Sequence, residues 1–351
     1  MASNYKLEIK GELPGEIAHH YESQGGDSIF STANRFTVKR SQRTIQFEIP
    51  IHSANKALSY SRILRRALRL DKSNAVFNHR GDGVVILYGG VIYFYDLAAD
   101  RLTRTGRLRQ CRNVLHCGIA VTERGIYFGE YGHNTQREAV PVWRSCDDGR
   151  SWSIVYEFPP GSIKHIHGIY SDPYSPSLWI PTGDFAGECT VAEAKDPDFK
   201  TCIRHGDGTQ KWRPVSMFFE PDSILWPMDS PLETSYLQQF DRQTQTITQH
   251  RPFPGPIWYS KRFTDGIGIL QSSVEPGVGV TSDHAHLFAS KNLIDWTEVT
   301  KFQKDWWPMK YFKFGVIAFA GGNQTSDDFV IFGEALKGLD GRILRVGLTA
   351  V

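Results

Sequence analysis

Short runs of alternating apolar and polar residues, separated by polar or glycine-containing turns, recur along the chain. Alternation with a period of two is typical of half-buried β-strands, and two such runs around a turn predict a hairpin. The predicted hairpins start at Phe36, Val91, Val140, Cys189, Tyr236, Ala285 and Asp328. Their starts are separated by 55, 49, 49, 47, 49 and 43 residues. The pattern therefore indicates an internal repeat of about 48 residues.

Two more short strands precede most of these hairpins. Examples are "LHCGIAVTERGIYFGEYG" and "WRPVSMFFEPDSILWPMDSP". Four strands in each of seven repeats predict an all-β fold, a seven-bladed β-propeller with four-stranded antiparallel blades. We expect residues 1–351 to form this propeller as a single domain. A pair of β-sandwiches is the alternative, but it does not explain the regular spacing of the hairpins.

One segment, residues 55–72, departs from the strand pattern and predicts a short helical insert between the first two blades. Its apolar positions recur at helical spacing, and arginines surround them: Ala57, Ile63, Leu64, Ala67 and Leu68, with Arg62, Arg65, Arg66 and Arg69. The favoured interpretation is a helix packed on one face of the propeller with solvated arginines. The alternative is a basic wall over a pocket for an acidic ligand.

Composition agrees with a folded, turn-rich chain. Of the 351 residues, 40% are hydrophobic, and the chain has 32 Gly and 18 Pro. The net charge of +2 provides no excess for binding nucleic acid or an anionic membrane. No run is long enough to span a bilayer, and the start of the chain has no apolar signal region. We therefore expect a cytoplasmic protein, or a periplasmic or secreted one if a leader has been removed.

The cysteine content also favours the reducing environment of a cytoplasm. Five cysteines without a CxxC spacing fit reduced thiols, although a bridge between Cys189 and Cys202 is open at this stage.

The turn "SCDDGRSW", from Ser145 to Trp152, matches the Asp-box pattern S-x-D-x-G-x-x-W. In such a turn Ser145 and Asp147 can bond the backbone, Gly149 tolerates a positive φ, and the tryptophan packs under the turn. The stretch "SKNLIDW", from Ser290, is a degraded copy. This repeat plan resembles the BNR/Asp-box propellers, which include sialidases and polysaccharide-cleaving enzymes. Asp147 and Asp148 are accordingly expected to be structural.

Ligand sites of propellers usually form at the mouth of the central channel, where the innermost strands begin and the second strands end. Alignment of the repeats places four residues at corresponding positions of adjacent blades: His116, His167, Arg213 and Tyr259. The ends of the second strands add carboxylates: Glu130, Asp184, Asp229 and Glu275. His133 follows Glu130 closely, and the tryptophans that align are Trp212 and Trp258.

These residue types suit the removal of a proton next to a uronate carboxylate. Arginine can neutralise the carboxylate, histidine can act as the base, and tyrosine can protonate the leaving oxygen. The set resembles that of propeller lyases acting on uronate-containing polymers. By that resemblance His167 is the base, Arg213 the neutralising cation and Tyr259 the acid, with His116 as a second base or binding residue.

The remaining candidates would bind the substrate, an acidic oligo- or polysaccharide. They are His165, which shares a strand face with His167, and Glu130, His133, Asp184, Asp229, Trp212 and Trp258. The tryptophans could stack on sugar faces or belong to the core.

Several alternatives stay open. A glycoside hydrolase could use two of the four carboxylates. A sialidase is disfavoured, because "SRILRR" is not its arginine motif. The H-x-H pair of His165 and His167 could hold a metal ion, but the signal is weak and we expect no metal or cofactor. Finally, the chain could be a non-enzymatic propeller that binds a glycan or a protein, because this fold hosts many functions.

Overall fold

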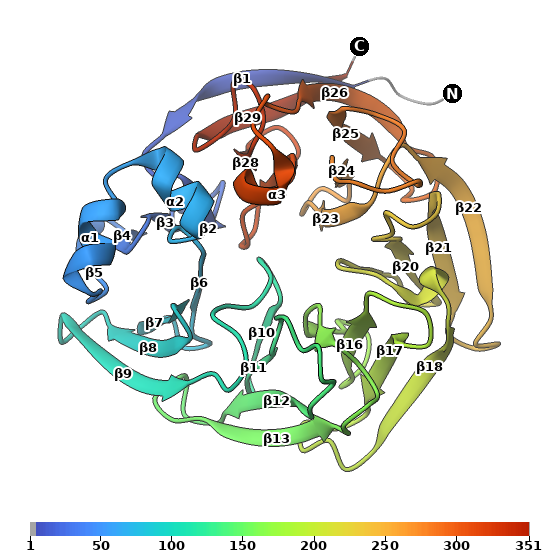
Figure 1. Ribbon diagram of the computed structural model, residues 1–351, viewed down its shortest axis with the longest axis horizontal. Coiled ribbons are helices and arrows are strands. Elements are labelled where there is room, and N and C mark those ends of the chain that lie inside the picture. The colour runs from blue at the N-terminus through green and yellow to red at the C-terminus, as the bar shows by residue number, and fades with distance from the viewer. Residues whose placement is uncertain (1–4, 351) are drawn as a thin grey trace. The chain divides into compact units, whose positions relative to one another are not determined.

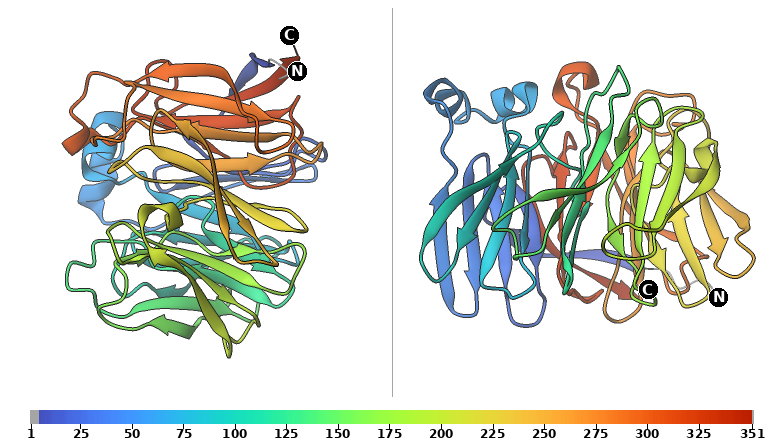
Figure 2. Two further views of the ribbon diagram at one scale, coloured as in Figure 1. Left: turned by 90° about the vertical axis from the view of Figure 1, so that its right-hand side faces the viewer. Right: turned by 90° about the horizontal axis from the view of Figure 1, so that it is seen from below.

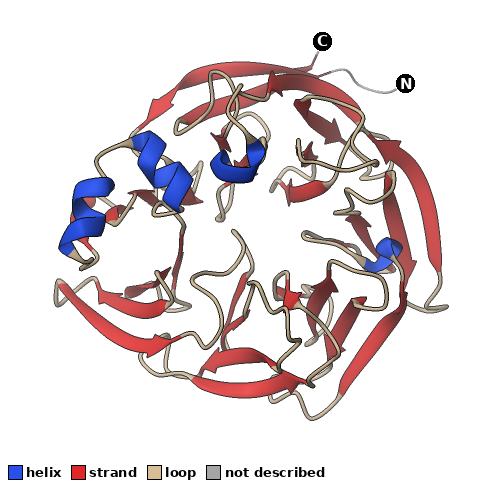
Figure 3. Ribbon diagram, in the orientation of Figure 1, coloured by secondary structure: helices blue, strands red, loops and turns tan. Residues whose placement is uncertain are grey.

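The computed structural model describes residues 5–350, apart from the side chains of residues 53–55. The described chain folds almost entirely into antiparallel β-sheets (Figure 1), with few helices (Figure 3). Seven sheets are present, and their strand order confirms the all-β class, a seven-bladed β-propeller with four-stranded antiparallel blades. The chain divides into two compact units, Met1–Asp71 with Ser216–Val351, and Lys72–Val215. The prediction of a single domain stays a prediction.

The first unit contains four of the sheets. One sheet comprises β2 (Ile17–Tyr21), β3 (Ser28–Thr32), β4 (Arg35–Arg40) and β5 (Arg43–Glu48). The next comprises β19 (Phe218–Phe219), β20 (Ser223–Pro227), β21 (Ser235–Asp241) and β22 (Ile247–Phe253). A third comprises β23 (Ile257–Arg262), β24 (Gly268–Ser272), β25 (His284–Ser290) and β26 (Thr297–Gln303). The last comprises β27 (Val316–Phe319), β28 (Phe329–Glu334), β29 (Ile343–Ala350) and β1 (Tyr5–Leu13).

The second unit contains the other three sheets. The first comprises β6 (Ser73–Phe77), β7 (Gly83–Tyr88), β8 (Val91–Asp96) and β9 (Arg101–Arg107). The second comprises β10 (Ile119–Thr122), β11 (Gly125–Gly129), β12 (Val140–Ser145) and β13 (Ser153–Phe158). The third comprises β14 (His165–Ile166), β15 (Tyr170–Ser171), β16 (Leu178–Gly183), β17 (Cys189–Ala194) and β18 (Cys202–Gly208). Here β14 and β15 both pair with β16, so the innermost strand is interrupted.

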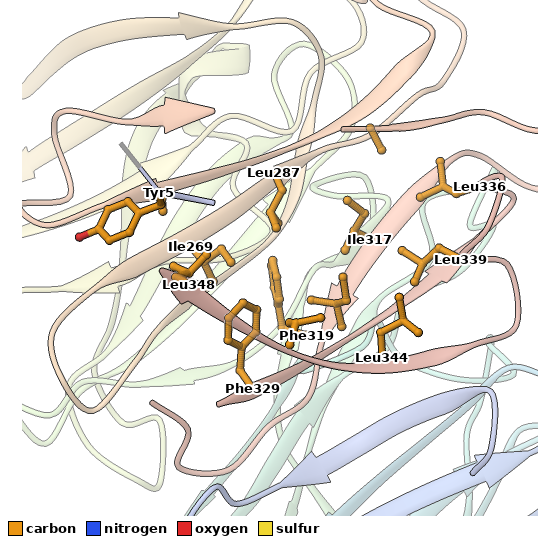
Figure 4. Close-up of a cluster of buried hydrophobic side chains, with 14 of the residues drawn as sticks. Tyr5, Ile269, Leu287, Ile317, Phe319, Phe329, Leu336, Leu339, Leu344 and Leu348 are labelled. Atoms are coloured by element: carbon orange, nitrogen blue, oxygen red, sulfur yellow. The ribbon is translucent and has the colours of Figure 1, made fainter. Parts of the chain in front are cut away.

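Within each unit, neighbouring sheets pack face to face through their second strands. In β11, Ile126 and Phe128 pack in one cluster with Val85, whereas Tyr127 between them packs in another with Ile180. Alternate side chains of this strand therefore enter different cores, which explains why its residues are all buried. The largest core of the first unit joins β24 and β25 to β27, β28 and β29 in the same way (Figure 4).

The last sheet corrects one predicted pairing. The hairpin starting at Asp328 comprises the second and third strands of its sheet, β28 and β29, and the N-terminal strand β1 supplies the fourth. The register runs from Tyr5 opposite Ala350 to Leu13 opposite Ile343, with an irregularity between Ile9 and Gly11. The repeat pattern could not reveal this strand, because its partner lies at the other end of the chain.

The helical insert is present, but its orientation is the reverse of the favoured prediction. It forms two helices, α1 (Ser53–Leu58) and α2 (Arg62–Leu68), and α2 packs beside α3 (Met309–Phe312). All three lie beyond the same ends of the strands of their unit (Figure 2). Arg65 and Arg66 are buried, whereas Ile63 and Leu68 are 49% and 46% exposed. The prediction of solvated arginines is therefore wrong for Arg65 and Arg66.

Ion pairs explain the burial of these arginines. Arg62 contacts Glu16, Asp71 and Asp340 at 3.0 Å each. Arg65 pairs with Glu16 as well, and Arg66 Nη2 lies 2.8 Å from Asp305. Because buried charges require partners, the acidic residues hold the arginine face of α2 inward. Arg62, Arg65 and Arg66 are thus engaged within the protein and only Arg69 is exposed, which also removes the basis for a basic wall over a ligand pocket.

The Asp-box turn has the predicted geometry. It joins β12 to β13, and Asp147 Oδ1 accepts hydrogen bonds from the amides of Arg150 and Ser151 at 3.1 and 2.8 Å. Gly149 has φ of +97°, and its amide donates to Ser145 Oγ at 2.8 Å. In the degraded copy, Asn292 replaces the aspartate and accepts the amides of Ile294 and Asp295. Both turns are therefore held by side chain to backbone bonds.

The cysteines are free thiols. In the β17–β18 hairpin, Cys189 is opposite Gly208 and Cys202 is opposite Ala194. The two cysteines lie at opposite ends of the hairpin, so the open possibility of a bridge between them is wrong. The longest helix of the described residues, α2, has seven residues and cannot span a bilayer.

Candidate functional site

Two histidines and an aspartate meet at one end of the sheet formed by β14 to β18. His165 in β14 is opposite Gly183, the last residue of β16, so Asp184 follows directly beside it. Gly183 has φ of +150°, which a residue with a side chain rarely adopts, and this turn carries the chain into Asp184. His167 lies two residues beyond His165 and therefore shares its face of the strand. Local backbone geometry thus brings the three side chains together.

Asp184 is the centre of this cluster. Its Oδ1 lies 3.3 Å from His165 Nε2, 3.4 Å from His167 Nε2 and 3.0 Å from Arg213 Nη2. Its Oδ2 lies 2.5 Å from Lys164 Nζ. Two permanent cations and two imidazoles therefore surround a single carboxylate. We call these five residues the Asp184 cluster.

The other nitrogen of each imidazole contacts a backbone carbonyl. His165 Nδ1 lies 3.0 Å from the carbonyl oxygen of Gly132, and His167 Nδ1 lies 2.7 Å from that of Pro214. A carbonyl oxygen only accepts, so both Nδ1 atoms carry the proton in these contacts. The Tyr131 ring, 4.1 Å from that of His165, packs against the pair. Both imidazoles are therefore fixed in orientation.

Arg213 reaches the cluster from a different segment. It follows the short 3-10 helix η1 (Gln210–Trp212), and its Nη1 donates to the carbonyl oxygen of Asp184 at 3.0 Å. The same Nη1 lies 3.2 Å from Gln210 Oε1. Gln210 Nε2 in turn donates to the Asp184 carbonyl oxygen at 3.0 Å. Backbone and side chain of Asp184 are both held by this segment.

The environment of Asp184 strongly favours its charged form. Burial by itself raises the pKa of this carboxyl, because the charged form loses water. The facing imidazoles of His165 and His167 outweigh that effect and hold the pKa of Asp184 well below its usual range. The carboxylate is thus ionised throughout the physiological range.

The accessible part of the site surrounds an exposed aromatic ring. Phe185, directly after Asp184, is 49% exposed. The guanidinium carbon of Arg137 lies 5.5 Å from the centre of the ring, and Lys164 Nζ lies 5.3 Å from it. Arg137 also pairs with Glu188 at 2.6 Å. We call Phe185, Arg137 and Lys164 the Phe185 rim.

The structure brings together four predicted site residues, His165, His167, Asp184 and Arg213. Four other predicted residues belong to the same unit: His116, Glu130, His133 and Trp212. His116 lies in the turn before β10, two residues from Gly118, whose carbonyl oxygen accepts the amide of Ile169. Trp212 lies in η1 and is buried, and His133 is exposed in the loop after β11. Their predicted roles stay predictions.

Glu130 is buried at the end of β11, and its carboxylate is already engaged. Oε1 accepts the amide of Arg109 at 2.7 Å and the indole N–H of Trp143 at 2.9 Å. Oε2 accepts the amide of Gln110 at 2.7 Å. These bonds fix the preceding loop, and the predicted contact of Glu130 with substrate stays a prediction.

The remaining predicted residues belong to the other compact unit. Tyr259 in β23 packs against hydrophobic cores of that unit. Trp258 donates its indole N–H to Glu275 at 3.1 Å. Asp229 is buried after the end of β20. Their predicted roles in catalysis or substrate binding stay predictions.

Sequence reasoning missed Lys164, Gln210, Phe185 and Arg137. Lys164 directly precedes the H-x-H pair, and Phe185 directly follows the predicted carboxylate, so proximity to those residues was the available signal. Arg137 and Gln210 come from loops of other strands. These two residues reach the site through tertiary contacts, and the repeat pattern of the sequence does not predict such contacts.

Comparison with known proteins provides the fold but no family. No protein-family model and no curated protein matches the chain. The chain is similar to the solved structure of U3-55K, with a TM-score of 0.55 and 9% identity over 97% of this chain and 98% of that chain. It is also similar to a chain in the crystal structure of a mitotic checkpoint complex, with a TM-score of 0.55 and 7% identity over 98% of this chain and 93% of that one. At such identities the likeness concerns the fold alone.

Proposed function

We propose that this protein is a non-enzymatic binding propeller, and that it binds an acidic oligo- or polysaccharide at the Asp184 cluster and the Phe185 rim. The observation that carries this proposal is the excess of positive groups there. Lys164, Arg213 and Arg137 outnumber the carboxylates of Asp184 and Glu188, and two imidazoles adjoin them. A ligand carboxylate would offset the excess, and guanidinium groups match its geometry.

The exposed ring of Phe185 supports a saccharide as the bearer of that carboxylate. The C–H face of a sugar ring is apolar and can cover an aromatic ring, which removes both from water. Lys164 and Arg137 flank the ring and would meet carboxylates at the sugar's edge. The resemblance of the Asp-box turn and repeat plan to those of carbohydrate-active propellers points to the same class of ligand.

Binding is favoured over cleavage by the state of the predicted base. A general base needs an accessible nitrogen within reach of the substrate proton. His167 is 1% exposed, its Nδ1 contacts the carbonyl oxygen of Pro214, and its Nε2 faces Asp184. Arg213, the predicted neutralising cation, is paired with Asp184 and only 7% exposed, so it adds positive charge to the site but little accessible surface. Cleavage by β-elimination or hydrolysis is therefore the second hypothesis, which the same experiment tests.

The test is calorimetric titration of the protein with uronate oligosaccharides and with neutral oligosaccharides of equal length. We expect saturable binding of the acidic series alone, weakened by salt because the charges are partly screened. Phe185→Ala and Lys164→Gln should each weaken binding about tenfold or more, the loss of roughly 1.4 kcal/mol. Lys195→Gln is the matched control, because Lys195 also pairs with a carboxylate, Glu193, in the same sheet.

Three outcomes would contradict the proposal: no saturable binding, equal binding of neutral sugars, or an equal loss of affinity in Lys195→Gln. The same mixtures are monitored for ultraviolet absorbance and for new reducing ends. A rise in absorbance would establish the lyase hypothesis instead, and new reducing ends without absorbance would establish a hydrolase.

A further inference from the structure

Three atoms that commonly ligate metals converge in the Asp184 cluster. Nε2 of His165, Nε2 of His167 and a carboxylate oxygen of Asp184 all lie within 4.8 Å of one another. Each Nε2 lies 3.3 or 3.4 Å from Asp184 Oδ1. Hydrogen bonds of this kind are usually about 2.7–3.2 Å long. Two ligands of a tetrahedral ion, each at about 2.0–2.1 Å from it, lie roughly 3.3–3.4 Å apart. The separations fit ligands of a shared ion better than hydrogen bonds.

The orientation of both imidazoles agrees with this interpretation. Each Nδ1 donates its proton to a backbone carbonyl oxygen, of Gly132 or of Pro214, so each Nε2 is the nitrogen that faces Asp184 and could ligate an ion there. Histidines that bind metals almost always donate their other ring N–H to a carboxylate or a carbonyl, which fixes the ring and its tautomer. Both members of the H-x-H pair have that outer bond.

A second observation points to a missing partner at the same place. His165 is 3% exposed, and its buried Nε2 has no hydrogen bond. Two imidazole lone pairs facing one carboxylate oxygen repel it unless positive charge lies between them. A divalent ion between them would supply that charge.

We propose that His165, His167 and Asp184 bind one divalent ion of the zinc class. Imidazole nitrogen with a single carboxylate suits Zn²⁺ and its first-row neighbours, whereas Mg²⁺ and Ca²⁺ prefer oxygen ligands. Three protein ligands leave one position open, as in sites where water or a ligand completes the coordination. Lys164 and Arg213 contact the same carboxylate, so an anionic group is the ligand best suited to that position. The proposal does not rest on saccharide binding.

The experiment uses the full chain without an affinity tag, freed of metal with a chelator. Zn²⁺ is added in a calorimeter, and Co²⁺ is added while visible absorption is recorded. We expect one equivalent of each ion to bind, with the intense d–d bands of tetrahedral Co²⁺. His165→Ala and His167→Ala should each weaken Zn²⁺ binding at least 100-fold.

The matched control is His205→Ala. Nε2 of His205 also faces a carboxylate oxygen, that of Glu193 at 3.2 Å. Glu193, however, is faced by one imidazole, whereas Asp184 is faced by two. This variant should bind Zn²⁺ as the unmodified chain does. Circular dichroism verifies that each variant is folded, and the unmodified chain gives an independent measure, because Zn²⁺ should raise its melting temperature.

The proposal is overturned if the unmodified chain binds neither Zn²⁺ nor Co²⁺ stoichiometrically. It is also overturned if folded His165→Ala and His167→Ala retain full affinity, or if His205→Ala loses as much. Saccharide titrations in chelator and in Zn²⁺ keep the two proposals apart, since a metal-free chain that binds acidic sugars would fail only the metal proposal.

Discussion

At the scale of single residues, the Asp184 cluster is assembled from three segments of the chain. Lys164, His165 and His167 come from the start of the sheet, Asp184 follows β16, and Arg213 follows η1. Another carboxylate of the same sheet, Glu193 in β17, is held in a comparable way. It contacts Lys195 at 2.6 Å, Ser177 at 2.8 Å and His205 at 3.2 Å. Cations and imidazoles thus surround two ionised carboxylates in this sheet, Asp184 and Glu193.

We predict that Glu193 contributes to stability in a pH-dependent way. Burial raises its pKa, but the contacts of His205, Lys195 and Ser177 prevail and lower it from 4.5 to about 2. Because the folded pKa lies below the unfolded one, the stabilisation is complete above about pH 4.5 and is lost as the pH falls towards 2. Glu193→Gln should cost about 3 kcal/mol at pH 7 and flatten the decline of stability below pH 4.5.

Urea unfolding at pH 7 and pH 3 measures this effect. Glu157→Gln is the control, because Glu157 forms an exposed pair with Arg109 at 2.6 Å, and it should change stability by less than about 0.5 kcal/mol. An equal cost at both pH values for Glu193→Gln would contradict the linkage.

At the scale of elements, α2 shows what periodicity can and cannot decide. Ile63, Leu64, Ala67 and Leu68 form one stripe along the helix, and Arg62, Arg65, Arg66 and Arg69 form another. The two stripes were evident from the sequence, and apolar burial normally decides between them. Here acidic residues distant in sequence, such as Asp305 and Asp340, reverse the choice. A pattern within one segment contains no information about such partners.

We predict that replacing a buried arginine of α2 destabilises the protein more than replacing an apolar residue does. In an ordinary amphipathic helix the order is the reverse. Arg66→Ala should destabilise the protein by about 3–5 kcal/mol, because Asp305 and Asp340 lose a buried partner. Leu68→Gln should cost no more than about 0.5 kcal/mol, because the side chain is exposed. Chemical denaturation measures both, and a greater loss in Leu68→Gln would indicate that the apolar stripe faces inward.

At the scale of the whole molecule, the two ends of the described chain form one sheet. Strand β1 completes the sheet of β27, β28 and β29, and Tyr5 belongs to the core shown in Figure 4. Without β1, the backbone groups of β29 would be an open edge, and Leu348 would lose its cover. This pairing therefore ties the start of the chain to its end.

We predict that a chain lacking residues 1–13 melts at least about 5 °C lower than the full chain and aggregates more readily. Differential scanning fluorimetry and light scattering measure these effects. A chain that starts at Tyr5 keeps β1 and is the control, and it should melt above the chain without β1. Equal melting of the chain without β1 would show that this pairing contributes little.

The hairpins and the H-x-H pair show how much local pattern predicts. Six of the seven hairpins form the third and fourth strands of their sheets, because alternation and turn residues are local properties. Strand alternation likewise predicted that His165 and His167 share a face, and repeat alignment predicted that Arg213 lies near them. The pairing of β1 with β29 and the place of Gln210 and Arg137 depend on contacts between distant segments.

By itself, the sequence determined the fold class, the repeat, the Asp-box turn and most residues of the Asp184 cluster. Each follows from spacing, since strands, turns and corresponding blade positions recur along the chain. Only the tertiary structure decided which face of α2 is buried, which strand completes the last sheet, and that Asp184 joins two imidazoles to two cations. The first and third outcomes depend on buried charges that meet partners from other segments, and the second depends on backbone pairing between the two ends of the described chain. No local pattern contains the energy of such contacts.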